Sequence, residues 1–133
     1  MKLSFRVLED DLSICRFLPD ASVPDWVWTS RFYSITKTDN ELSIVASSRS
    51  VPKDEHVPCE SHFRAIGMEG TLDFSLIGIL AEIGSLLAQK GISIFAISTY
   101  DTDYILVGSQ DLKKAVFTLR EAGHTVMWDE EAV

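Results

Sequence analysis

The segment from Gly70 to Val107 constrains the fold more than any other part of this chain, because it predicts a helix and a hairpin in direct succession. Gly91 is placed to end the helix, since glycine readily adopts the left-handed conformation that closes one. The next residues, Ile92–Thr99 and Tyr104–Val107, are rich in β-branched and aromatic side chains, which is typical of paired strands. The helix itself is predicted by apolar residues at the spacing of a single helical face, namely Leu76, Ile79, Leu80, Ile83, Leu86 and Leu87.

The overall charge excludes several classes of partner. The 133 residues carry a formal net charge of −8, and residues 129–131 form an acidic run. Because this surface repels phosphate backbones and no basic stripe offsets it, we expect no nucleic-acid binding. The apolar runs are far shorter than the roughly 20 residues that span a membrane. The first residues do not resemble a secretory signal, so we expect no membrane association and a cytoplasmic location.

The two cysteines, Cys15 and Cys59, are too few for a disulfide scaffold, and we expect both to be free thiols. Cys59 lies near His56 and His62, which raises the question of a metal site. A structural zinc site needs four convergent ligands, and the chain offers no second cysteine-rich pair. We therefore favour a thiol and two solvated imidazoles in a linker, and expect neither a metal nor another cofactor.

No arrangement of residues indicates catalysis. Ser75 and Ser85 lie in or beside the predicted helix without a nucleophile elbow, and no carboxylate and imidazole are visibly arranged around them. We expect no catalytic residues and no enzymatic activity.

A polar, proline-containing stretch at 48–61 predicts a boundary between two units, 1–61 and 62–133. The second unit has the order β-α-β-β-α-β of the ferredoxin-like fold, which stacks two helices on one face of an antiparallel sheet. Its predicted segments are His62–Glu69, Leu76–Lys90, Ile92–Thr99, Tyr104–Gly108, Leu112–Ala122 and Thr125–Trp128.

The first unit reads as a shorter copy of the second. Residues 35–47 align with residues 97–109 at a constant offset of 62, and a short segment at 24–28 replaces the long helix. We place a strand at Leu3–Leu8 in this first unit, together with a hairpin of Arg31–Lys37 and Glu41–Ser47. Three aromatic residues of the unit, Trp26, Trp28 and Tyr33, are interpreted as core residues rather than as a pocket wall.

The start of the predicted long helix has the chemistry to bind a carboxylate, because its first amides lack intrahelical acceptors and the helix dipole favours negative charge. Gly78 leaves the backbone open there. Asp101 and Asp103 in the hairpin turn, with strand-edge carbonyls near Ser98, are candidate partners for an ammonium group. The alternative is structural: Gly78 permits close packing, and the two aspartates form the turn.

Two stretches resemble the ACT-domain family. Gly78-Ile79-Leu80-Ala81 is similar to the glycine and Leu-Ala pair at the start of that family's first helix, and residues 87–94 are similar to the helix end and second strand. Residues 97–107 resemble the hairpin of a subgroup of paired ACT domains. That subgroup includes the arginine-sensing CASTOR proteins and is related to the regulatory domains of aspartate kinases.

The resemblance implies an α+β fold of two tandem ferredoxin-like (βαββαβ) ACT units, with antiparallel sheets, helices on one face and an abbreviated first unit. It also implies a non-catalytic allosteric sensor that binds an amino-acid effector at the loop-helix/strand interface between ACT units, forms a homodimer and acts on a partner enzyme. The alternative is a ligand-free protein interaction or dimerisation module. The ligand-binding positions that the resemblance indicates are Leu76, Ile77, Gly78, Ile79, Ser98, Thr99, Asp101 and Asp103.

Overall fold

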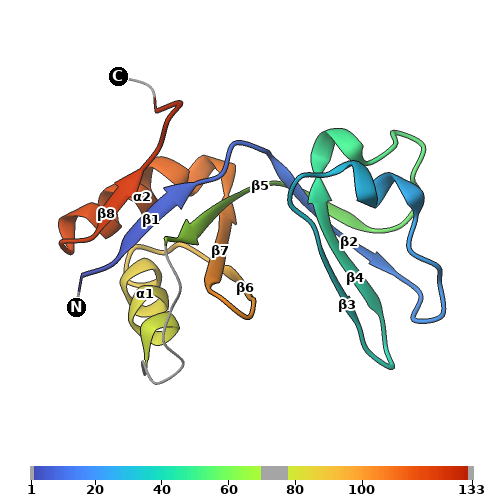
Figure 1. Ribbon diagram of the computed structural model, residues 1–133, viewed down its shortest axis with the longest axis horizontal. Helices are drawn as coiled ribbons and strands as arrows, with labels where there is room; N and C mark the ends of the chain where they lie inside the picture. The colour runs from blue at the N-terminus through green and yellow to red at the C-terminus, as the bar shows by residue number, and fades with distance from the viewer. Residues whose placement is uncertain (1, 70–77, 132–133) are drawn as a thin grey trace. The chain divides into compact units, whose positions relative to one another are not determined.

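The computed structural model describes residues 2–69 and 78–131. The chain divides into two compact units, and each unit has its own apolar core. Unit 1 contains residues 1–9 and 64–133, and unit 2 contains residues 10–63. Figure 1 traces the elements of both units along the chain.

Unit 1 has a sheet with the strand order β6-β7-β5-β1-β8. Strand β1 is antiparallel to β5 and parallel to β8, whereas β6 and β7 form an antiparallel hairpin. Apart from the inserted β1, this is the order of a ferredoxin-like sheet. The strands are β1 (Ser4–Val7), β5 (Cys59–Met68), β6 (Phe95–Ser98), β7 (Asp103–Gly108) and β8 (Thr125–Met127).

Two helices, α1 (Ile79–Ala88) and α2 (Leu112–Glu121), cover one face of this sheet (Figure 1). Residues of the strands and of both helices share a single apolar cluster, which establishes that the two helices pack on the same face. The helical spacing of the apolar residues made this burial predictable. Members of the cluster are Phe5, Ile66, Ile105 and Val126 from the strands, Ile83 and Leu87 from α1, and Val116 and Leu119 from α2.

Unit 2 is the abbreviated copy, with the strand order β3-β4-β2-β5. It contains β2 (Leu12–Phe17), β3 (Ser34–Lys37) and β4 (Leu42–Ser47), and a 3-10 helix at Asp25–Thr29 stands where unit 1 has its long helix. Strand β5 contributes its first half to this sheet and its second half to unit 1. The predicted fold class, two ferredoxin-like units with the first abbreviated, is therefore confirmed.

The first strand was assigned to the wrong unit. Strand β1 pairs with β5 and β8, so it lies inside the sheet of unit 1 rather than in the N-terminal unit. The structure thus divides the chain differently from the predicted units 1–61 and 62–133. The physical reason is that β1 offers hydrogen-bonding groups on both sides, and pairing with β8 is a long-range contact that no local pattern encodes.

A bulge in β5 marks the point where the strand passes from one unit to the other. Between the pairs Leu12↔Phe63 and Ile14↔Glu60, β5 has one residue more than β2. His62 has φ of 69° there, a left-handed conformation that is uncommon for a residue other than glycine. Such a bulge bends a strand and increases its local twist.

The two hairpins are equivalent at an offset of 61 rather than the predicted 62. Lys37 pairs with Leu42 in unit 2, and Ser98 pairs with Asp103 in unit 1, so equivalent positions differ by 98 − 37 = 61. The turns share their hydrogen bonds as well. The Thr99 amide donates to the carbonyl of Thr102 at 2.8 Å, and the equivalent Thr38 amide donates to the carbonyl of Glu41 at 2.9 Å.

The expectation of free cysteines is wrong, because Cys15 and Cys59 form a disulfide. Strands β2 and β5 are antiparallel neighbours, and their register places these two residues directly opposite each other with their Cα atoms 4.1 Å apart. The preceding stretch is also less of a linker than predicted, since Val51 and Val57 pack against the core of unit 2. Neither fact follows from spacing along the chain.

The acidic run after β8 is held by three arginines of unit 1. The pairs made by Arg6 and Arg120 are exposed and each stabilises the fold little, whereas the side chain of Arg64 is largely buried. The hydrogen bonds from the Arg120 guanidinium are the main cause of the lowered pKa of Glu131. The pairs are Asp129 with Arg6, Glu130 with Arg64 and Glu131 with Arg120.

Across residues 2–69 and 78–131, no helix has both the length and the apolar character needed to cross a membrane.

Candidate functional site

The N-terminus of α1 presents an open backbone. Gly78 precedes the helix with φ of 79°, and its carbonyl accepts the first helical hydrogen bond, from the amide of Glu82 at 2.8 Å. The amides of Ile79, Leu80 and Ala81 come before that bond and have no acceptor within the helix. These amides lie at the positive end of the helix dipole, where a carboxylate is stabilised.

The described residues leave open space beside Gly78. Among residues 2–69 and 78–131, a Cβ atom built at this position meets no heavy atom within 4 Å. Gly78 is therefore required for its conformation and not for close packing, which removes one of the two structural alternatives. The side chain of Ile79 is buried in the core of unit 1, so only its backbone is available to a ligand. The predicted positions Leu76 and Ile77 lie outside the described residues.

The polar residues of the β6–β7 hairpin largely satisfy one another. The hydroxyl of Ser98 donates to the carboxylate of Asp103, and the hydroxyl of Thr99 accepts from the amide of Thr102 at 3.1 Å. These contacts match the structural alternative, in which short polar side chains build the turn. Asp101 is exposed. Its carboxylate is the member of the predicted set best placed to receive a cation from solvent.

The structure thus keeps the predicted positions in two groups. Gly78 and Ile79 form one group at the start of α1, and Ser98, Thr99, Asp101 and Asp103 form the other at the hairpin turn. Within the portion of the chain that the structure describes, no hydrogen bond or ion pair joins the two groups.

The prediction that three aromatic residues of unit 2 lie in its core is correct for one of them and wrong for the other two. Trp26 packs against the core of the unit and lies 6.4 Å from Phe17 between ring centroids. Trp28 and Tyr33, however, are 52% and 42% exposed and form an edge-to-face pair with centroids 5.3 Å apart. Their exposure arises because the short 3-10 helix covers less of the sheet than a full helix would.

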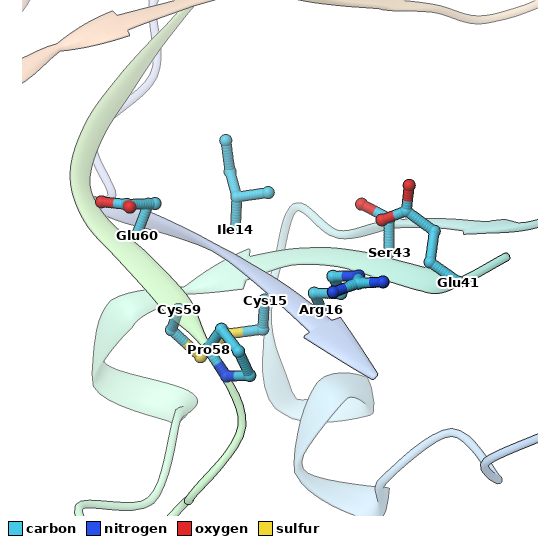
Figure 2. A pocket seen from close by; sticks show the side chains of 8 residues that line it. All are labelled: Ile14, Cys15, Arg16, Glu41, Ser43, Pro58, Cys59 and Glu60. Atoms are coloured by element: carbon cyan, nitrogen blue, oxygen red, sulfur yellow. A yellow bond between two sulfur atoms is a disulfide. The ribbon is translucent and has the colours of Figure 1, made fainter. Parts of the chain in front are cut away.

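A cavity of about 290 Å³ in unit 2 was not identified from the sequence (Figure 2). Its charged residues are Arg16, Glu41 and Glu60. The alternation along β2 is the sequence signal for part of this lining. Cys15 is buried on one face of the strand, so Ile14 and Arg16 on either side of it lie on the other face. The partners on neighbouring strands depend on register, which the sequence alone does not provide.

The two helices on one face of an antiparallel sheet define a ferredoxin-like α+β fold, and the comparisons with known proteins agree with this class. The family model for the ACT domain matches residues 59–121. A second family model, for an N-terminal domain, matches residues 10–54.

Solved structures extend the likeness over the whole chain. A protein from Agrobacterium tumefaciens is 32% identical with a TM-score of 0.90, covering 100% of this chain and 98% of its own. The ligand-free regulatory subunit of aspartate kinase from Thermus thermophilus has a TM-score of 0.62 at 10% identity, covering 90% of this chain and 96% of the subunit. At that identity the likeness concerns the fold alone.

A human protein named CASTOR3P is 29% identical over 109 residues. The match covers 74% of this chain and 66% of the human protein, so the chain spans slightly less than two thirds of that relative. These matches show an ACT domain at residues 59–121 of the chain, and the Agrobacterium tumefaciens protein shares the fold over the whole chain.

Proposed function

We propose that this chain is a non-catalytic regulatory protein that binds an amino acid. The effector's carboxylate is held by the backbone amides at the start of α1. Its ammonium group is held by Asp101 in the hairpin turn of a second copy of the chain, and the resemblance to paired ACT domains supports such a site between two copies. The proposal includes a homodimer and a partner enzyme that responds to the bound effector.

The observation that carries this proposal is the conformation and environment of Gly78. Gly78 has a φ of 79°, and no described residue lies within 4 Å of a Cβ built there. The three amides after it precede the first helical hydrogen bond and have no intrahelical partner. The regulatory role is supported by the fold shared with the regulatory subunit of an aspartate kinase. The ACT domain at residues 59–121 supports the small-molecule effector.

A thermal-shift screen of the twenty amino acids tests the proposal on the full chain. A ligand present at about 100 times its dissociation constant stabilises the folded state by about 2.7 kcal/mol. We expect a single amino acid, or a few amino acids with similar side chains, to raise Tm. A flat response from all twenty, with correct folding verified by circular dichroism, would refute amino-acid sensing.

Two glycines provide a matched pair of variants. Gly78 and Gly91 stand at opposite ends of α1, both have positive φ, 79° and 74°, and neither has a heavy atom within 4 Å of a built Cβ. Alanine therefore costs about 1–2 kcal/mol of backbone strain at either position. Only Gly78→Ala is expected to weaken ligand binding as well. Equal affinity in the two variants would place the ligand elsewhere.

A second candidate function, association without a ligand, is favoured by the exposed edge of the unit 1 sheet. Strand β6 pairs with β7 and forms one end of the strand order, and Ile94 just before it is 37% exposed. An unpaired strand edge is a template for pairing with another chain. This candidate predicts concentration-dependent association in sedimentation experiments that persists in Gly78→Ala and does not respond to any amino acid.

A further inference from the structure

A cavity of about 290 Å³ lies within unit 2 and involves no residue of α1 or of the β6–β7 hairpin (Figure 2). Three charged side chains, a hydroxyl and two apolar side chains line it, together with the disulfide-bonded pair. The lining residues are Ile14, Cys15, Arg16, Glu41, Ser43, Pro58, Cys59 and Glu60.

The strand register brings these residues together. Arg16 of β2 is opposite Ser43 of β4, and Ile14 is opposite Glu60 of β5. Residues 14 and 16 share one face of the sheet, because successive side chains of a strand point to opposite faces. The backbone amide of Arg16 also donates to the carbonyl of Pro58 at 2.9 Å, which fixes the loop at the rim of the cavity.

The floor of the cavity is held in place by a covalent bond. The disulfide between Cys15 and Cys59 joins the same two strands that carry Arg16 and Glu60. A site built on paired strands with a crosslink between them loses little conformational entropy when a ligand binds. The crosslink fixes the backbone of the two strands, from which the exposed side chains of Arg16 and Glu60 extend.

The charged groups of the cavity are not neutralised by one another. In the described parts of the chain, none of the ion pairs or side-chain hydrogen bonds involves the guanidinium of Arg16 or the carboxylates of Glu41 and Glu60. Figure 2 shows the Arg16 side chain on the side of Ser43 and Glu41, with Glu60 beyond Ile14. One cation therefore lies among two anions and a hydroxyl, around an apolar centre.

This arrangement defines the chemistry of a ligand. A guanidinium binds a carboxylate through two parallel hydrogen bonds, and each glutamate is a partner for an ammonium group. The three charges of the lining sum to −1, so the complementary ligand carries one negative and two positive groups. A volume of about 290 Å³ is at the lower end of the roughly 300–1,000 Å³ typical of ligand pockets, which fits a small ligand.

We infer that unit 2 carries a second ligand site, distinct from the start of α1, that binds a diamino carboxylate. Arg16 binds the carboxylate of the ligand. Glu41 and Ser43 bind the ammonium group next to that carboxylate, and Glu60 binds the ammonium group at the other end of the ligand. Ile14 and Pro58 contact the methylene groups between the two ends.

Three probes of one carbon skeleton test each contact. L-ornithine has one carboxylate and two ammonium groups, L-norvaline lacks the distal ammonium, and putrescine lacks the carboxylate. Titrations followed by ¹H–¹⁵N correlation spectra of the full chain are expected to move the amide signals of Ile14, Ser43 and Glu60 with L-ornithine. Losing one charge-assisted contact weakens binding about tenfold or more, so norvaline and putrescine are expected to bind correspondingly less tightly.

Matched variants separate this site from the start of α1. Arg16→Met and Glu60→Gln are expected to weaken ornithine binding at least tenfold, whereas Arg49→Met is expected to leave it unchanged, since Arg49 is an exposed arginine of the same unit paired with Asp10. Gly78→Ala is also expected to have no effect on this binding. Absence of ornithine-induced shifts at the cavity overturns the inference, as does undiminished binding in a folded Arg16→Met variant. Neither outcome bears on the effector proposed for α1.

Discussion

Reduction of the disulfide between Cys15 and Cys59 is expected to destabilise unit 2 selectively. The bond closes a loop with a sequence separation of 44 and lies entirely within residues 10–63. In the chain-entropy model a loop of this length contributes about 4 kcal/mol by restricting the unfolded state. Whole domains are stable by only about 5–15 kcal/mol, so this is a large share of the stability of a unit of this size.

Amide hydrogen exchange measured by mass spectrometry with and without reductant locates the effect. Because each 1.4 kcal/mol is a factor of ten, a loss of 4 kcal/mol speeds exchange through unfolding of unit 2 by about a thousandfold. Peptides that cover β2 and β4 are expected to show this acceleration, whereas those from α2 in unit 1 are expected to change little.

The variant Cys15→Ala/Cys59→Ala is the control, because its exchange is expected to be fast and indifferent to reductant. Equal exchange rates of the oxidised and reduced wild-type protein over β2 and β4 would contradict the reasoning. So would equal acceleration in both units, since the loop closed by the bond contains no residue of unit 1.

Three further predictions concern stability. Leu119→Ala removes a fully buried side chain of α2 and is expected to lower the free energy of unfolding by about 3–4 kcal/mol in urea titrations, whereas Phe117→Ala, at a position 60% exposed on the same helix, is expected to change it by less than about 0.5 kcal/mol. His62→Gly relieves the left-handed conformation at the bulge and is expected to raise stability by about 1 kcal/mol in the same assay; a loss would show that the imidazole contacts outweigh the strain. The Arg120 guanidinium lowers the pKa of Glu131, so this pair stabilises the fold above the unfolded-state pKa of the carboxyl, near its ordinary value of 4.5, and that contribution is lost as the pH falls through the lower folded-state pKa. Glu131→Gln is therefore expected to be slightly less stable than wild type at pH 7 and equal to it in strong acid, and a difference that persists in acid would contradict this assignment.

Local sequence patterns predicted the individual elements well. The apolar spacing over Leu76–Lys90 predicted α1, although the structure places its start at Ile79 within the described residues. Both hairpins were also predicted, because strand propensity and polar turns are local signals. The four-residue turns that begin at Thr38 and Thr99 share their hydrogen bonds, which supports the predicted relation between the units.

Pairing between distant strands was not predictable in the same way. The position of β1 between β5 and β8, and the meeting of Cys15 with Cys59, depend on register across long stretches of chain. A shift of one residue would turn every side chain of a strand to the other face. The same limit explains why the cavity around Arg16 was missed. The left-handed conformation of Gly78 was not predicted either, because the helix was expected to begin at Leu76.

The placement of β1 has a consequence for the order in which the chain folds. Residues 4–7 are synthesised about 120 residues before their parallel neighbour at residues 125–127. The sheet of unit 1 therefore closes only after nearly the whole chain has left the ribosome. The continuous segment 10–63 completes its own pairing much earlier. Until β8 is available, β1 has only β5 as a partner in the sheet, and its other edge is open to incorrect pairing.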